Sequence, residues 1–364
     1  MAHSLVQDVG SRTSSPCRLI SHPIPYLAPR NGPAPGPNDG HDGHVLVRFL
    51  AAPVNRVDLM VLGGQYPVEP LFREAGQPVP GFDGVGQVEA STSPRFRAGD
   101  LVLPRRLGLG TWRTHAVLPA ASLLGLPAGT PPLAAALLRS GAAVAWLLLE
   151  GMAAYSAALH PGDWLIVSAG TSVVAQLVAQ LAARRGLRAA LVIRDRAGDG
   201  AEAVKQKLRG LGAAAVLTES ELHEAAAGSR LPVRPVLALD SVFGAVGQDL
   251  AAALAPGGTF VLVGLLAGPA ASITVTTQYL FSRQISFLPF RSSELLKKMS
   301  DAGTEELLAK LAGFFIDGTL DIPELHVVDW KQAGPGGVEE ALRRAAGAAR
   351  SAEPGHVKTV WVLS

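Results

Sequence analysis

Residues 166–196, IVSAGTSVVAQLVAQLAARRGLRAALVIRDR, constrain the fold of this chain more than any other stretch. They read as an apolar strand, a tight turn, an apolar helix that Gly186 can cap, and a second apolar strand ending in charge. This order predicts a βαβ unit, whose turn can bind a nucleotide phosphate at the helix N-terminus. The turn contains one glycine, Gly170, so the sequence leaves open how closely its backbone approaches a pyrophosphate.

The alternation of strands and helices continues on both sides of this unit. A helix is predicted at 131–152, where PPLAAALLRSGAAVAWLLLEGM has proline at its start. Strands are predicted further along at 213–218, 235–244 and 259–268, with helices at 205–211 and 250–255. Strands that alternate with helices predict a doubly wound parallel sheet, so we expect an α/β fold.

The flanking parts of the chain have a different pattern. Between 44 and 127, short strands are interrupted every few residues by glycine and proline, which predicts a small β-barrel. Extended segments return at 317–330 and 356–364, around a helix predicted at 337–349. We therefore expect a nested arrangement of two domains: a β-domain at 1–130 and 321–364, and an inserted dinucleotide-binding domain at 131–320.

The composition argues against several classes of protein. The net charge is +2 and only 17% of residues are charged, so no nucleic-acid partner is expected. Cys17 is the one cysteine, which excludes a disulfide within the chain and a cysteine-rich zinc site. No uninterrupted apolar run reaches the roughly 20 residues that span a bilayer. The closest, 133–149, contains Arg139 and is interpreted as a buried helix, so no membrane contact is expected.

The N-terminal sequence MAHSLVQDVGSRTSSPCRL lacks the apolar core of a secretory signal. Its serine and arginine residues are similar to those of a mitochondrial presequence, but Asp8 and the helix-poor GSRTSSP argue against one. We therefore expect a cytoplasmic protein, with mitochondria as the alternative compartment.

Several short motifs follow one another in an order that resembles the medium-chain dehydrogenase/reductase superfamily along nearly the whole chain. They are AAPVNRVDLMVLGGQYP (51–67), GFDGVGQV (81–88), RAGDLVLP (97–104), GLGTWRTHAV (108–117), HPGDWLIVSAGTS (160–172) and VIRDR (192–196). GLGTWRT and VIRDR are most similar to the mitochondrial-type trans-2-enoyl-thioester reductases. The resemblance implies a GroES-like β-barrel domain with an inserted Rossmann domain. It also implies reduction of the 2,3-double bond of an acyl thioester with NADPH and without a metal.

The resemblance implies a catalytic role for Tyr66 and Asn55. Tyr66, in GGQYP, stands where the family has a tyrosine acid that stabilises the developing enolate or protonates it. Asn55 would help to position that hydroxyl. Asn55 and Asp58 can equally cap the following helix, and a tyrosine in a loop can simply cover an apolar surface.

Two aromatic residues are implied to bind substrate. Trp112 lies where the family lines the cleft; it can pack on an acyl chain or belong to the core. Neighbouring Arg113 is expected to pair with a buried carboxylate. Phe290 lies in ISFLPFRSSE, at a position where the family has an aromatic run beside the nicotinamide and the substrate.

The implied NADPH site combines a turn, a basic pair and two isolated residues. The turn contributes Gly170, Thr171, Ser172, Val173 and Val174. Arg194 and Arg196 follow the second strand of the βαβ unit, where two guanidinium groups suit the 2′-phosphate of NADP, although a solvated charged turn has the same composition. Gly264, in TFVLVGLLAG, and Lys358, in the last predicted strand, complete the set, although an isolated lysine on a strand often faces solvent.

The sequence departs from the family pattern along the cofactor path. Val173 and Ala175 stand where the family turn has glycines. The helix before the turn, GAAVAWLLLEG, lacks an asparagine that the family places near the nicotinamide, and Pro289, Phe290 and Arg291 replace the core of the aromatic run.

Three hypotheses follow for the activity. The first is a zinc-independent NADPH-dependent reductase of an activated C=C bond in an enoyl thioester or enone, acting in specialised metabolism. The second is a redox-silent relative with the same fold, such as a cyclase, an isomerase or a binding subunit. The third is a quinone reductase. A homodimer is expected, with TFVLVGLLAG near the edge of the sheet through which it forms.

Overall fold

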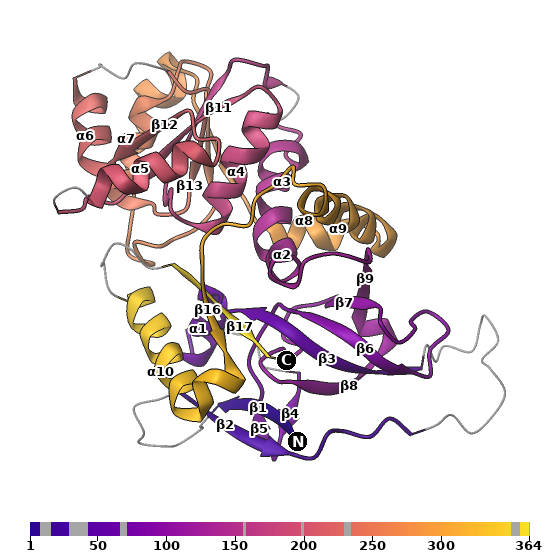
Figure 1. Cartoon of the computed structure of the whole chain (residues 1–364). Helices are drawn as coiled ribbons and strands as arrows, with labels where there is room; N and C mark the ends of the chain where they lie inside the picture. The colour runs from indigo at the N-terminus through magenta and orange to yellow at the C-terminus, as the bar shows by residue number, and fades with distance from the viewer. Residues whose placement is uncertain are drawn as a thin grey trace. The chain divides into compact units, whose positions relative to one another are not determined.

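The computed structural model describes residues 1–7, 16–28, 43–65, 71–155, 158–197, 200–228, 234–350 (349 and 350 by backbone only) and 357–363. The chain divides into two compact units (Figure 1). Unit 1 consists of Met1–Ser140 and Asp301–Ser364, and unit 2 of Gly141–Ser300. The α/β fold class predicted from the sequence is confirmed, with a mainly antiparallel sheet in unit 1 and a six-stranded parallel sheet in unit 2.

Unit 1 is built on a seven-stranded sheet in the order β16-β17-β3-β6-β7-β9, with β8 also paired to β3. The strands are β3 (His44–Pro53), β6 (Val85–Ser91), β7 (Leu101–Pro104), β8 (His115–Pro119), β9 (Leu123–Leu126), β16 (Leu325–Asp329) and β17 (Lys358–Val362). Short strands β4 (Arg73–Glu74) and β5 (Gln77–Pro78) form a separate pair, and a short 3-10 helix, η1 (Ala120–Ser122), precedes β9. In Figure 1 the C-terminal strands β16 and β17 (yellow) join β3 (indigo), because β17 pairs antiparallel with β3.

An N-terminal pair of strands completes unit 1. β1 (Ala2–Gln7) pairs antiparallel with β2 (Cys17–His22), a pairing that the sequence analysis did not predict. Leu5 is fully buried, and its N–H donates to the carbonyl of Trp112 at 2.9 Å. The sequence signal for β1 is weak. Leu5 and Val6, which follow Ser4, are both buried, so buried and exposed residues do not alternate along Ala2–Gln7.

Unit 2 contains a six-stranded parallel sheet in the order β12-β11-β10-β13-β14-β15. Its strands are β10 (Trp164–Val167), β11 (Arg188–Ile193), β12 (Ala215–Thr218), β13 (Leu237–Asp240), β14 (Thr259–Leu262) and β15 (Ser286–Pro289). Its helices are α3 (Ala143–Trp146), α4 (Val173–Arg184), α5 (Gly200–Gly210), α6 (Glu219–Ala227), α7 (Gly244–Ala253) and α8 (Ser292–Lys298). Figure 1 shows helices α4 to α7 around these strands.

The direction of winding reverses beside β10. The chain runs from β10 outward to β11 and β12, and then returns to place β13 on the other side of β10. Right-handed crossovers then put the connecting helices on both faces of the sheet. In sheets of this kind ligands bind at the carboxyl ends of the strands flanking the reversal, here β10 and β13.

The predicted long helix at 131–152 is a composite. It contains α2 (Pro132–Leu137), a π-helical segment η2 (Leu138–Ala142), α3, and a second π-helical segment η3 (Leu147–Gly151). By length and composition alone, the stretch Pro132–Gly151 could cross a membrane, which the sequence analysis did not expect of any run in the chain. However, 67% of the 18-residue window that passes this test is buried inside the protein, as in a core helix.

The domain boundaries differ from those predicted. Residues 131–140 and 301–320 were assigned to the Rossmann domain, but in the structure both belong to unit 1. The reason is packing: α9 (Asp301–Ile316) contacts β9, and α2 contacts β3 and α9. Sequence periodicity identifies a helix but does not say which sheet it covers. The C-terminal helix α10 (Trp330–Arg350) also begins earlier than predicted, with a break at Gly334, whose φ is 64°.

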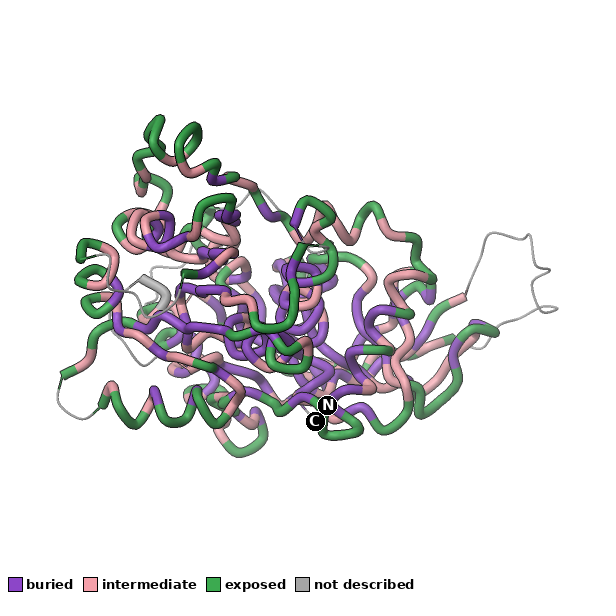
Figure 2. The backbone as a smooth tube through the Cα atoms, turned by 90° about the horizontal axis from the view of Figure 1, so that it is seen from above, coloured by how far each residue is buried: buried purple, intermediate pink, exposed green. Residues whose placement is uncertain are grey.

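Strands such as β3 and β11 are largely buried, and Figure 2 shows the buried stretches of the tube in purple. At one edge of the unit 2 sheet lies β15, so β14, the strand of TFVLVGLLAG, is second from the edge and not at it. Pro289 ends β15, a position an edge strand tolerates because its outer side needs no ladder hydrogen bond. Leu280 and Phe281, in the π-helical segment η5 (Gln278–Ser282) shortly before β15, are 56% and 86% exposed.

Candidate functional site

Three polar side chains from distant parts of the sequence meet in unit 1. Asn55 precedes α1 (Arg56–Leu62), Asp58 lies in its first turn, and Lys358 begins β17. Pairing of β17 with β3 brings Lys358 to Asn55: its Nζ donates to Asn55 Oδ1 at 2.6 Å. Asp58 Oδ2 accepts from the Asn55 N–H at 2.7 Å, and Asp58 Oδ1 accepts from the Phe82 N–H at 2.8 Å. We call Asn55, Asp58 and Lys358 the lysine cluster.

Burial brings the pKa values of the two ionisable groups in this cluster close to neutral pH. Asp58 is 2% exposed, and the loss of water raises the pKa of its carboxyl to about 7, against the lowering effect of the Asn55 and Phe82 N–H groups. Burial likewise lowers the pKa of Lys358 to about 8, while the charges of Asp58 and Asp83 work to raise it. Groups that titrate near neutral pH in this way are common in functional sites.

A second buried carboxyl, Asp83, adjoins the lysine cluster. Its Oδ1 accepts from the Gly84 N–H and its Oδ2 from the Ser140 N–H, both at 3.1 Å. Burial raises the pKa of Asp83, while the charge of Arg139 lowers it. Arg139, which interrupted the apolar run in the sequence, thus has a structural function: it faces Asp83 and donates to the carbonyl of Pro104.

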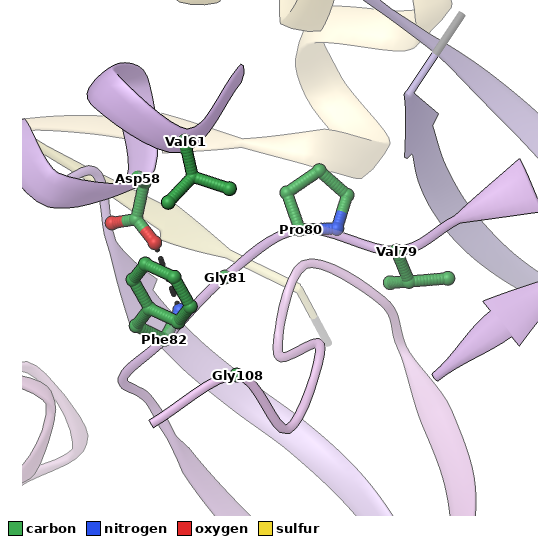
Figure 3. Close-up of a pocket in the computed structure, with 7 residues that line it drawn as sticks. All are labelled: Asp58, Val61, Val79, Pro80, Gly81, Phe82 and Gly108. Atoms are coloured by element: carbon green, nitrogen blue, oxygen red, sulfur yellow. Dashed lines mark hydrogen bonds between the residues drawn. The ribbon is translucent and has the colours of Figure 1, made fainter. Parts of the chain in front are cut away.

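Asp58 also lines a pocket of unit 1 (Figure 3). The pocket contains about 210 Å³ of space, open solvent included, and its other lining residues are Val61, Val79, Pro80, Gly81, Phe82 and Gly108. Figure 3 shows the Asp58 carboxyl hydrogen-bonded to the backbone of Phe82. The lining therefore combines an apolar wall with one ionisable group, in a solvent-open hollow that is smaller than a typical small-molecule site.

Tyr66, the implied acid, lies outside the described residues, and its function stays a prediction. The chain is described up to Gln65, three residues beyond the end of α1 at Leu62. The α1 helix that carries Asp58 therefore also leads into the segment containing Tyr66. The expectation that Asn55 and Asp58 cap this helix is met by the Asn55 N–H to Asp58 bond.

Trp112 requires a correction, because it is a core residue of unit 1. It is 0% exposed, donates from Nε1 to the carbonyl of Pro53 at 3.3 Å, and makes an edge contact with Trp361 at 5.9 Å between ring centres. Such a ring is not available to an acyl chain. Arg113 is also buried, but its guanidinium lies over Phe72, 4.9 Å from the ring centre, and burial lowers its pKa to about 10.

In unit 2, the turn after β10 is held in shape from several sides. Ala169 has a φ of 50°, in the left-handed region that disfavours a side chain. Gly170 leaves no room for one: an added Cβ would lie 2.9 Å from the Val192 carbonyl oxygen. Ser172 caps α4 by accepting from the Ala175 N–H at 3.2 Å, and Gln176 Nε2 donates to the Thr171 carbonyl at 2.8 Å. Gly170 is therefore needed for packing of the turn on β11.

The turn keeps donors suited to a phosphate. Thr171 and Ser172 are half-buried, and the N–H groups of Val173 and Val174 open α4, where a helix attracts negative charge. The Val173 side chain is 8% exposed, so it is packed within the protein rather than projecting freely into solvent. The residues present fit a phosphate group, although the binding of one here stays a prediction.

A buried network at the ends of β10 and β13 was missed by the sequence analysis. Ser168 Oγ donates to Asp240 Oδ1 at 2.6 Å and accepts from the Ser241 N–H at 2.8 Å. Asp240 is fully buried and also accepts from the N–H groups of Val242 and Phe243. Burial raises the pKa of Asp240 against the effect of these donors. A signal was present: Ser168 and Asp240 are polar residues at the ends of apolar strands that become neighbours.

After β11, the acid of the sequence RDR is engaged and the basic residues flank it. Asp195 Oδ2 accepts from the Ser220 hydroxyl at 2.9 Å. Slight burial works to raise the pKa of Asp195, but hydrogen bonds from Ser220 and Thr218 hold it below its ordinary value. Arg194 is exposed; burial raises the pKa of Glu219, while the charge of Arg194 works to lower it. Arg196 is half-buried, and its Nε is buried with no hydrogen-bond partner among the described residues.

Gly264 and Phe290 follow the last two strands of the sheet. The Gly264 N–H donates to the Asp240 carbonyl at 3.2 Å, and an added Cβ would lie 3.2 Å from the Ser241 carbonyl, so glycine allows close approach to the Asp240 network. Phe290 is 7% exposed, and its N–H donates to the Leu262 carbonyl at 2.9 Å. Its implied substrate contact therefore depends on the small part of the ring that is exposed.

Among the residues that the structure describes, no group of three or more His, Cys, Asp or Glu side chains is placed to hold a metal ion.

The alcohol dehydrogenase GroES-like domain family matches residues 41–128. The mitochondrial enoyl-[acyl-carrier-protein] reductase of Rattus norvegicus is 35% identical over 303 residues, covering 81% of this chain and 77% of the relative. The corresponding protein of Homo sapiens is 34% identical over 284 residues, covering 77% and 73%.

Solved structures show the same fold. The Etr1p/NADP/crotonyl-CoA complex has a TM-score of 0.78 at 22% identity, and the Etr1p/Etr2p heterodimer of Candida tropicalis, a 2-enoyl thioester reductase, has 0.79 at 22%. Each covers 99% of both chains. A putative NADPH:quinone reductase from Bacillus thuringiensis has a TM-score of 0.73 at 23% identity and covers 100% of both chains.

Proposed function

Since this chain belongs to the mitochondrial-type enoyl-[acyl-carrier-protein] reductase family of the medium-chain dehydrogenases/reductases, we propose that it is an NADPH-dependent reductase of a 2-enoyl thioester or enone. The observation that carries the choice of NADPH over NADH is the arrangement after β11. An acid at this point binds the ribose hydroxyl of NAD, but Asp195 is occupied by Ser220. Exposed Arg194 and half-buried Arg196 flank it, and two guanidinium groups at this point suit the charge of a 2′-phosphate.

Bound NADPH would supply the hydride for C3 of the double bond. The N–H groups of Val173 and Val174, with the hydroxyls of Thr171 and Ser172, would hold its pyrophosphate. Tyr66 would hydrogen-bond the developing enolate or protonate C2. Asn55 and Lys358 would orient polar groups of the bound molecules, which suits their fixed hydrogen bond.

The first test is titration with NADPH and NADH by fluorescence, followed by oxidation of NADPH in the presence of a short enoyl-CoA. We expect binding that favours NADPH and substrate-dependent oxidation. Absence of binding at millimolar NADPH, with the protein shown to be folded, would reject the proposal. NADPH oxidation coupled to loss of the double bond would in turn reject a redox-silent cyclase, isomerase or binding subunit.

Replacement of Arg196 tests the cofactor preference directly. Loss of a charged hydrogen bond costs about 1.5–3 kcal/mol, so Arg196→Ala is expected to weaken NADPH binding by roughly 10- to 100-fold and leave NADH binding nearly unchanged. Arg209→Ala is the matched control, because Arg209 is an exposed arginine of the same unit that pairs with Glu202. Equal losses for NADPH and NADH would show that Arg196 does not read the 2′-phosphate.

Tyr66→Phe separates chemistry from cofactor binding. The variant removes only the hydroxyl, so turnover should fall by at least about tenfold, as for loss of a general acid, while NADPH affinity is unchanged. Unchanged turnover would exclude Tyr66 as the acid.

A quinone reductase is the second candidate, favoured by the structural likeness to the Bacillus thuringiensis protein. It uses the same cofactor site and differs in substrate. A panel of enones, quinones and enoyl thioesters compared by kcat/KM decides between them. Higher kcat/KM for quinones than for all enoyl thioesters would replace the first proposal.

We propose a homodimer formed at β15, supported by its edge position and by the exposure of Leu280 and Phe281 nearby. Phe281→Asp should shift the mass measured by light scattering from dimer to monomer, with Tyr26→Asp, exposed in unit 1, as the control.

The compartment stays a prediction. The sequence favours the cytoplasm and the names of the relatives favour mitochondria, and imaging with a C-terminal tag will separate the two.

A further inference from the structure

We propose that Asp58 is a positioning residue for the reduction, holding Asn55 in place and keeping the Lys358 ammonium protonated and bound to Asn55. This inference rests on the proposed function, because it concerns the protonation of the lysine cluster during the reduction. Asp58 itself touches neither the cofactor nor the substrate. It acts through Asn55 and Lys358.

The geometry of Asp58 shows why its function extends beyond a helix cap. One carboxyl oxygen accepts from the Asn55 N–H within the first turn of α1, which is the capping bond. The other accepts from the Phe82 N–H, which fixes the wall of the pocket to α1 (Figure 3). A single side chain therefore sets the position of the Asn55 backbone relative to the pocket.

The charge of the same carboxyl also has the strongest raising effect on the pKa of Lys358. Burial lowers the pKa of Lys358, and the charges of Asp58 in α1 and of Asp83 before β6 work to raise it, Asp58 more than Asp83. Asp83 is shared with Arg139. On the adjacent strand β16, His326 is directed to the Thr359 hydroxyl, 3.5 Å away.

An ammonium in this position is costly without such a partner. Burial favours the neutral amine, and a neutral amine would donate more weakly to Asn55 Oδ1, now 2.6 Å away. With Asp58 charged, the amine stays protonated to higher pH, and the three-residue arrangement remains fixed. Loss of the Asp58 charge is therefore expected to alter the Asn55–Lys358 contact as well as the charge presented to the bound molecules.

The experiment measures the protonation of Lys358 separately from activity. The full chain is labelled with acetic anhydride over a series of pH values, and the labelling of Lys358 is followed by mass spectrometry. In the Asp58→Asn variant, the midpoint should move to lower pH by about one unit, since an opposite charge at this range shifts a pKa by roughly 1–3. An unchanged midpoint in folded Asp58→Asn would overturn the proposal.

Asp100→Asn is the matched control. Asp100 makes the same local contact, accepting from the Arg97 N–H at 2.7 Å, but in an exposed turn. It should leave the Lys358 midpoint and the pH profile of kcat/KM unchanged. An equal shift of the Lys358 midpoint in Asp100→Asn would show that loss of any nearby negative charge has this effect, and would overturn the proposal.

The kinetic readout uses NADPH-dependent reduction. Asp58→Asn should lower kcat/KM by about tenfold and move its alkaline limb to lower pH. Lys358→Arg covers the case in which Asp58→Asn does not fold: a guanidinium stays charged throughout this range, so the alkaline limb should disappear. Its persistence at the same pH would overturn the proposal. If the wild-type chain reduces no substrate, the proposed function fails, while the labelling midpoints still decide whether Asp58 controls Lys358.

Discussion

Each unit of this protein buries a carboxyl beside its candidate site, but the two carboxyls have different partners. Asp58 in unit 1 accepts two backbone N–H groups and faces the charge of Lys358. Asp240 in unit 2 accepts from the Ser168 hydroxyl and two backbone N–H groups. Burial raises the pKa of both.

The difference indicates separate functions for similar groups. A carboxyl and a lysine that lie close together shift each other's pKa, so the carboxyl can control whether the lysine is protonated near neutral pH. A carboxyl surrounded by neutral donors fixes the backbone around it. In unit 2 that backbone includes Phe243, which has a φ of 69° and is held through its N–H by Asp240 Oδ2.

The pH dependence of stability gives the largest expected contrast. The folded-state pKa of Asp58 is raised to about 7, so its favourable contribution is complete below pH 4 and is lost as the pH rises through 7. The pKa of Lys358 is lowered to about 8, so the lysine penalises folding below pH 8 and that penalty disappears as the pH rises toward its unfolded value of 10.5. The cluster should therefore contribute least between pH 7 and 8.

Urea unfolding at a series of pH values measures this. Relative to Asp58→Asn, the wild type should lose on the order of 4 kcal/mol between pH 4 and 8, at about 1.4 kcal/mol per pH unit of pKa difference. Lys358→Met should remove the rise above pH 8. A difference between wild type and Asp58→Asn that does not vary with pH would show that burial does not perturb this carboxyl.

Removal of the unit 2 carboxyl should have the next largest effect. Asp240→Ala leaves Ser168 and the Val242 and Phe243 N–H groups without their acceptor, at a cost of about 3 kcal/mol in the free energy of unfolding. Denaturant titration measures this cost. Asp249→Ala, at a carboxyl of the same unit that contacts the exposed His223, should cost less than about 1 kcal/mol. Equal costs would mean that the Asp240 network does not organise the loop.

The smallest effect concerns backbone strain at Ala169, next to Ser168. Around the unit 1 pocket, the positive-φ positions are glycines, Gly81 at 101° and Gly108 at 89°, whereas Ala169 adopts 50° with a side chain. Ala169→Gly should therefore stabilise the protein by up to about 1 kcal/mol. Ala190→Gly, at a buried position within β11, is the control and should destabilise it. Destabilisation by Ala169→Gly would indicate that the turn is not strained.

The sequence by itself determined the fold class, the strand–helix order of unit 2 and the family, because hydrophobic periodicity and short motifs are local properties of the chain. It identified Lys358 but not its partner, since only the pairing of β17 with β3 brings the lysine to Asn55. It placed Trp112 in a motif but left its burial open, because the tertiary contact with Trp361 decides whether the ring is accessible.

Only the tertiary structure joined Ser168 to Asp240, which are 72 residues apart, because the reversal of winding makes β10 and β13 neighbours. It also decided which sheet α2 and α9 cover. The protonation of Asp58 and Lys358 belongs to the same category. The pKa of a side chain depends on the water and charge around it, and these are set by the packing of distant segments.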